Sequence, residues 1–167
     1  FSLTRWLHRA WRPMAFLETT TCCLALLLLL LSGAACSGDA SGPGDELAPL
    51  VGGWRADALV LTNKANSSIS LDLVEEGAAF TLSILGNGQY SASLTAFGQA
   101  NVEVGTISVK GTQITITPTT PQGPPTVGTW RIEGDILTVE GDTEFDFNQD
   151  GTTEAATVRM ALRRVDL

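Results

Sequence analysis

The chain has 167 residues, with 18 acidic and 10 basic side chains and a formal net charge of −8. Such a chain lacks the basic face that nucleic-acid phosphates require, which argues against nucleic-acid binding. The single histidine, His8, and the three cysteines, Cys22, Cys23 and Cys36, all precede residue 37. The rest of the chain therefore has no means of forming a Ser-His-Asp triad, a disulfide or a cysteine nucleophile, and we expect it not to be an enzyme.

Residues 1–35 have the layout of a signal peptide. Arg5, Arg9 and Arg12 make a basic start, and ten apolar residues follow at positions 22–31. A run of that length is too short for a membrane-spanning helix, which needs roughly 20 apolar residues. Small residues then lead to Cys36. This order predicts export, with cleavage just before the cysteine.

The end of the leader resembles the bacterial lipoprotein signal, in which a leucine and two small residues precede a lipid-bearing cysteine. Ala34 and Ala35 stand directly before Cys36, and Gly33 takes the place of the usual leucine. The resemblance implies acyl chains on Cys36 that hold the protein at a membrane of the cell envelope. An ordinary secretory peptide cut at an A-x-A-like site stays open, and it would leave a secreted or periplasmic protein.

A tether and one folded domain follow the leader. Residues 36–49 are rich in glycine, serine, proline and acidic residues, and they offer too little apolar surface to fold. Residues 50–167 are long enough for a single core. The leader carries three arginines and one glutamate, so the chain after it has a net charge of −10. That charge argues against a polybasic second membrane anchor.

From residue 54 onward, apolar and polar residues alternate as they do in half-buried β-strands. Strands are expected over residues 54–62, 80–84, 90–96, 102–110, 113–117, 127–133, 136–140, 143–147 and 153–165. Glycine-containing turns separate these runs at the spacing of a meander. We therefore predict an all-β domain, a single antiparallel meander that closes as a sandwich or barrel.

Three stretches interrupt the strand pattern. Residues 69–76 have a composition that permits one short helix after the first strand. The apolar positions change phase after Val102 and Val104, with Gly105 at the switch, which predicts a bulge or bend there. Residues 118–125 are rich in proline, and we expect them to form a loop instead of continuing a strand.

Two short motifs resemble those of lipocalin-like proteins. LVGGW from Leu50 resembles the G-x-W opening of the first lipocalin strand, and VGTWRIEGDILTV from Val127 resembles a hairpin of bacterial lipocalin-like domains. The resemblance covers residues 50–165 and implies a closed, calycin-type antiparallel barrel. It also implies structural roles for Gly52 and Trp54.

In that family the tryptophan plugs one end of the barrel, and an arginine of the last strand lies across its ring. Arg163 or Arg164 would supply this cation–π contact. The resemblance therefore makes Trp54 part of the core and not part of a binding site.

One loop has the spacing of a cation site. Asp146, Asn148, Asp150, Thr152 and Glu154 match positions one, three, five, seven and nine of an EF-hand-type calcium loop, with Gly151 at six. The closing acid is missing, because position twelve is Thr157, and the flanks are predicted strands. A hairpin loop in which Asn, Asp and Gly supply turn conformations is the alternative to calcium binding.

Two functions are compatible with this sequence. A lipid-anchored barrel could bind a small apolar ligand in its lumen, or a filled barrel could serve as a non-catalytic interaction or structural module of the envelope. The choice depends on which residues point inward. If Tyr90, Ala92, Leu94 and Ala96 face the lumen, it is apolar with a single hydroxyl, and if they face outward the interior is small and mostly polar.

Overall fold

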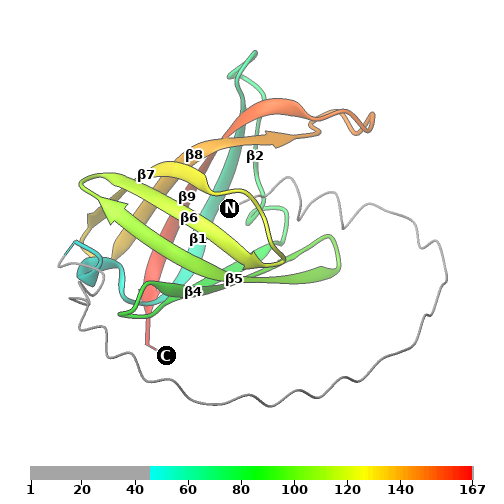
Figure 1. The fold of residues 1–167 in the computed structure, drawn as a ribbon. Coiled ribbons are helices and arrows are strands. Elements are labelled where there is room, and N and C mark those ends of the chain that lie inside the picture. The colour runs from blue at the N-terminus through cyan, green and yellow to red at the C-terminus, as the bar shows by residue number, and fades with distance from the viewer. Residues whose placement is uncertain (1–45, 167) are drawn as a thin grey trace, which may run out of the picture.

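A computed structural model of the protein describes residues 46–166, and the predicted leader and Cys36 lie outside this range. The described chain forms one antiparallel sheet that closes on itself (Figure 1). Its strands are β1 (Gly52–Asn63), β2 (Ser70–Asp72), β3 (Ala79–Ile84), β4 (Gln89–Ala96), β5 (Gln99–Lys110), β6 (Gln113–Thr120), β7 (Thr126–Glu133), β8 (Ile136–Phe145) and β9 (Glu154–Val165). The predicted all-β meander is confirmed, and it closes as a barrel.

The barrel has eight strands, and β2 lies outside it. Each strand from β3 to β9 pairs with the next, and β1 pairs with both β3 and β9. The seam between β1 and β9 is long, since it runs from Gly53 opposite Val165 to Asn63 opposite Ala156. The short β2 pairs only with the far half of β1, at residues 60–62.

The inward face of the strands is apolar because the alternation in the sequence matches the pleat. On β4, Tyr90, Ala92, Leu94 and Ala96 are all buried, while the serines and threonine between them lie on the outer face. On β1 a bulge at Asp57 changes the phase, so that Trp54 and Ala56 face inward before it and Leu59 and Leu61 after it. The core is therefore the barrel lumen.

One end of the barrel is closed by the segment that leads into β1. A single 3₁₀ turn, Ala48–Leu50, buries Leu50, and Leu47 before it is also buried. The Glu46 carboxylate accepts a hydrogen bond from the Gly111 N–H at 3.1 Å, in the β5–β6 turn. The packed part of the chain thus includes Leu47, three residues before the expected boundary.

The segment at residues 69–76 is not helical. It contains β2 and then a turn, which the Asp72 carboxylate organises by accepting hydrogen bonds from Leu59 N–H at 3.0 Å and Val74 N–H at 2.9 Å. An aspartate that binds backbone N–H groups in this way favours a turn over a helix interior.

Among the described residues no helix is long and apolar enough to cross a membrane.

Three further expectations need correction. The predicted strands at 136–140 and 143–147 are one continuous strand, β8, because Gly141 and Asp142 keep their pairing with β9. The strand β6 runs to Thr120 and buries Pro118, so the proline-rich loop starts later than expected. The strand β5 has no change of phase at Gly105.

The register does shift beside Gly105, but the extra residue lies on the neighbouring strand. Val104 pairs with Thr120 and Gly105 pairs with Pro118, which leaves Thr119 as the additional residue on β6. Since β5 itself stays regular, Val102 and Val104 point outward and Glu103 points into the lumen. The phase is the reverse of what apolar patterning predicts for this half of the strand.

Candidate binding surfaces of the barrel

The lumen is filled by side chains. Leu59, Leu61, Ala92, Leu137 and Leu162 each have 0% of their surface exposed. A side chain that lined a chamber with room for water would retain accessible surface, so these residues are in close contact with their neighbours. A small space of about 20 Å³, room for about one water molecule, lies beside Ile114, Ile116 and Met160.

One polar pair interrupts the apolar lumen. The Tyr90 hydroxyl donates a hydrogen bond of 2.8 Å to the Glu103 carboxylate, and Glu103 is 0% exposed. Burial, followed by the hydrogen bond and the charge of Glu103, raises the pKa of Tyr90 far above its ordinary value. Burying a carboxylate is unfavourable unless it is hydrogen-bonded, so Tyr90 makes the inward position of Glu103 tolerable.

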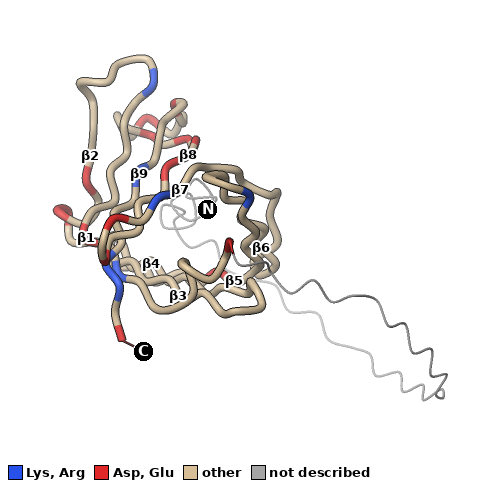
Figure 2. Tube along the Cα trace, turned by 90° about the vertical axis from the view of Figure 1, so that its left-hand side faces the viewer, with Lys and Arg blue, Asp and Glu red and all other residues tan. Residues whose placement is uncertain are grey.

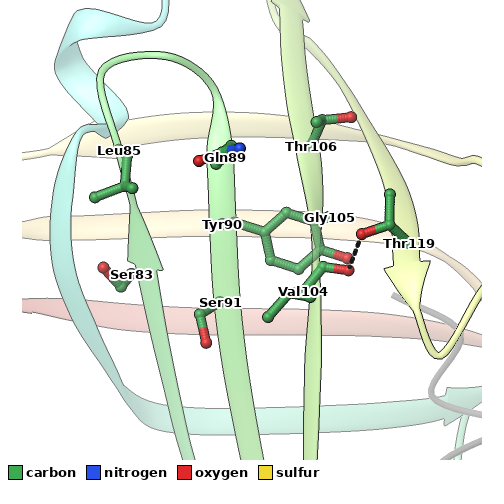
Figure 3. Close-up of a pocket in the computed structure, with 9 residues that line it drawn as sticks. All are labelled: Ser83, Leu85, Gln89, Tyr90, Ser91, Val104, Gly105, Thr106 and Thr119. Atoms are coloured by element: carbon green, nitrogen blue, oxygen red, sulfur yellow. Dashed lines mark hydrogen bonds between the residues drawn. The ribbon is translucent and has the colours of Figure 1, made fainter. Parts of the chain in front are cut away.

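Gly105 leaves room for the ring of Tyr90 because it has no side chain. The two residues are direct cross-strand partners, and a Cβ on Gly105 would lie 2.9 Å from Tyr90 Cε1 and 2.2 Å from the Thr117 carbonyl oxygen. Figure 3 shows the ring reaching from β4 toward Gly105. The aromatic ring therefore covers a glycine at which the neighbouring strands come unusually close.

A hollow of about 390 Å³ lies on the outer side of this region, across β3 to β6 (Figure 3). Its lining has no charged residue and consists of Ser83, Leu85, Gln89, Tyr90, Ser91, Val104, Gly105, Thr106 and Thr119. The Thr119 hydroxyl donates to the Val104 carbonyl oxygen at 3.1 Å, which holds the additional residue of β6 against β5. The hollow thus follows directly from the register shift.

The hollow belongs to a wall that is almost without charge, which we call the uncharged wall: the outer face of β3, β4, β5 and β6. From residue 77 to residue 130 the sequence contains only two charged residues, Glu103 and Lys110. Since Glu103 is buried, Lys110 at the end of β5 is the single charged side chain on this face of the described chain. Figure 2 shows the resulting asymmetry between the sides of the barrel.

The opposite side, formed by β8, β9 and β1, is the charged wall. Its outward charged residues are Arg55, Asp57, Glu140, Asp142, Glu144, Arg159 and Arg163. The Arg163 guanidinium lies 2.6 Å from the Asp57 carboxylate, and Lys64 lies 2.6 Å from Asp142. Both pairs are substantially exposed to solvent, where ion pairs contribute little to stability.

The residues implied by the lipocalin resemblance lie at the closed end. Of the two candidate arginines, Arg164 is the one over the Trp54 ring, with Cζ 4.2 Å from the ring centroid. Its guanidinium also donates to the carbonyl oxygens of Val51 at 2.8 Å and Pro49 at 2.7 Å. Gly52 has a φ of 133°, and a Cβ there would lie 2.8 Å from Arg164 Nη1. Arg164 thus clamps the 3₁₀ turn onto the barrel.

The candidate calcium loop is an exposed hairpin connection between β8 and β9. The Asp146 carboxylate accepts hydrogen bonds from the N–H groups of Asp150 and Gly151, and Glu154 accepts one from Phe147 N–H. Hydrogen bonds from Thr152 N–H, and then from the Asn148 side chain, lower the pKa of Asp150.

These carboxylates stabilise the turn itself. Within residues 46–166 no group of three or more His, Cys, Asp or Glu side chains is arranged to hold a metal ion. Calcium binding at Asp146, Asn148, Asp150, Thr152 and Glu154 stays a prediction.

Sequence reasoning missed both the buried Glu103 and the hollow. The available signal was the isolation of Glu103, one acidic residue within a long uncharged stretch. Such isolation fits a specific pairing better than a solvated surface, which normally carries several charges. The hollow had no signal, because it arises from a register shift between two strands.

Models of protein families, curated protein sequences and solved structures yield no match.

Proposed function

We propose that this chain is an exported lipoprotein, anchored through Cys36 to a membrane of the cell envelope, whose barrel acts as a non-catalytic interaction module. The observation that supports the module is the close packing of the lumen, where inward side chains such as Leu61, Leu137 and Leu162 are completely buried. Contacts with a partner would then involve the outer surface of the barrel. The anchor rests on the leader sequence, with a plain secretory or periplasmic form as the alternative.

The anchor has its own test. Cells that produce the full chain are labelled with a fatty-acid analogue, and the wild type should be tagged while Cys36→Ser is not. Equal labelling of the two proteins would remove the lipoprotein assignment. A processed but unlabelled wild type would favour the secretory alternative.

A small apolar ligand in a lipocalin-like barrel is the second candidate. It is favoured by the inward orientation of Tyr90, Ala92, Leu94 and Ala96, which makes the lumen apolar. Such a ligand would have to displace core side chains to enter, at a cost in packing. Native mass spectrometry of residues 37–167, purified without detergent, decides between the two. A retained small molecule would favour the carrier, whereas a bare mass and no response to a panel of lipids would favour the interaction module.

A further inference from the structure

Two features of the uncharged wall violate ordinary strand preferences. In the first half of β5 the two valines point outward, with Val102 59% and Val104 36% exposed, while Glu103 between them is completely buried. Patterning alone would place the valines inside. Tyr90 holds Glu103 inward through the 2.8 Å hydrogen bond and thereby keeps both valines on the surface.

The second violation is Phe97, in the two-residue turn between β4 and β5. It has a φ of 52° and precedes Gly98, with a φ of 73°. Turns of this shape usually contain Asn-Gly or Asp-Gly, because a bulky residue is strained at positive φ. The side chain gains little burial in return, since Phe97 is 60% exposed.

The two features lie on one face, on which Lys110 is the single charged side chain of the described residues. Departures of this kind are expected at functional sites, and the cores of protein interfaces are depleted in charged residues and enriched in aromatics. Leu85, 52% exposed at the rim of the hollow, adds a further apolar side chain. The uncharged wall therefore has the composition of a contact surface.

Building on the proposed interaction module, we propose that the partner of the uncharged wall is a second copy of this chain. With a net charge of −10 on each chain after removal of the leader, two copies repel one another through most approaches. The uncharged wall is the face on which that repulsion is weakest, and its apolar residues can pack against their own symmetry mates.

The arrangement of the wall suits a two-fold pair. Phe97 lies at one end of β4 and the hollow at Ser91 near the other, six residues apart, or about 20 Å at roughly 3.3 Å per residue. A two-fold axis midway between them would set Phe97 of each copy over the hollow of the other. Val102, which pairs with Ser93 in the middle of this span, would lie close to the axis.

Cross-linking of the full chain in cell membranes tests the pairing. Val102→Cys should yield dimers with a short bis-maleimide, because the two copies of residue 102 face one another near the axis. The wild type measures the background from Cys22, Cys23 and Cys36. Val127→Cys on β7 is the matched control, a valine of similar exposure (51%) outside the wall, and it should not cross-link above background.

A second variant removes the contact while keeping the reporter. Phe97→Asp in the Val102→Cys background should lower the dimer yield at least tenfold. Aspartate tolerates positive φ and position 97 is exposed, so the fold should survive, as an unchanged circular-dichroism melting curve would show.

Several outcomes would overturn the proposal. One is equal cross-linking of Val102→Cys and Val127→Cys. Another is a monomeric Val102→Cys whose thiol reacts freely with a maleimide dye or is shielded by lipid vesicles alone. Cross-linking to a protein of different mass would reject pairing between copies but leave the interaction module standing. A ligand retained in native mass spectrometry would weaken the module without altering the cross-linking result.

Discussion

The charged and uncharged walls of this barrel resemble each other on their inner faces, which both pack into the lumen, and differ in the composition of their outer faces. Val158 and Met160 of β9 pack into the lumen just as Ala92 and Leu94 of β4 do. Outside, β8, β9 and β1 carry ion pairs, whereas β3 to β6 carry Ser, Thr, Val and Gln (Figure 2). Folding thus constrains the inner residues of both walls similarly, and the outer composition is free to reflect contacts with other molecules.

The largest effect on stability is expected from adding a methyl group at Gly105, where β5 and β6 come very close together. Gly105→Ala should destabilise the protein by about 3 kcal/mol, because its Cβ would lie 2.2 Å from the Thr117 carbonyl oxygen. Gly141→Ala on β8 is the matched control, with its nearest contact an ordinary 3.5 Å from the Val127 carbonyl oxygen. Urea unfolding of both variants measures the difference, and equal midpoints would contradict the crowding described beside Gly105.

Replacing each of the adjacent residues Arg163 and Arg164 distinguishes the contribution of packing to stability from that of exposed charge. Arg164→Ala should cost about 2 kcal/mol, because two hydrogen bonds from a charged donor and the contact with Trp54 are lost. Arg163→Ala should cost less than about 1 kcal/mol, since its ion pair with Asp57 is exposed. Thermal unfolding distinguishes the variants. A larger loss for Arg163→Ala would mean that the outer charges do support the fold.

The buried pair Tyr90 and Glu103 should make the stability of the protein decrease at alkaline pH. Tyr90 stays protonated in the folded protein, because burial and Glu103 raise its pKa, whereas an unfolded tyrosine ionises near pH 10. Stability is therefore complete below about pH 10 and falls above it by about 1.4 kcal/mol per pH unit, as the unfolded state releases the proton.

Tyr90 is the only tyrosine, so absorbance of tyrosinate reports directly on this residue. The folded protein should show no tyrosinate signal above pH 10 until it unfolds. Tyr90→Phe is the control, and it should remove the additional slope in the stability curve. Ionisation of Tyr90 near pH 10 in the folded state would show that the pair is not buried as described.

The smallest effect is expected on the outer face itself. Val102→Thr should change the unfolding free energy by no more than about 0.5 kcal/mol, because the side chain is exposed. The same replacement at Val158, 5% exposed on the inner face of β9, should cost about 1–3 kcal/mol by burying a hydroxyl. Chemical unfolding of the two variants gives the comparison, and a large loss for Val102→Thr would indicate that the outer valines contribute to the monomer fold.

Much of the architecture could be predicted from alternation and turn chemistry. The hairpin of β3 and β4 and the hairpin of β7 and β8 lie where apolar alternation and Gly-containing turns placed them. The burial of Trp54 likewise agrees with its expected place in the core. These features are local, because each depends on residues close together in the chain.

The sequence predictions that failed concern places where a contact between distant residues overrides the local pattern. Glu103 faces inward where the Tyr90 hydroxyl on β4 donates a hydrogen bond to it, and Pro118 fits within β6 because the glycine opposite it leaves room. The segment at residues 69–76 forms a strand and turn because Asp72 binds a backbone group of β1. The hollow depends on the register shift beside Gly105, which no single strand specifies.

The seam between β1 and β9 has a consequence for when this protein can fold. The first and last strands of the domain must meet, so the ring of hydrogen bonds cannot close until nearly the whole chain is available. Pairings between such distant residues form slowly compared with local hairpins. In the export proposed above, this delay would keep the domain unfolded during translocation, and the barrel would close only after the last strand had emerged.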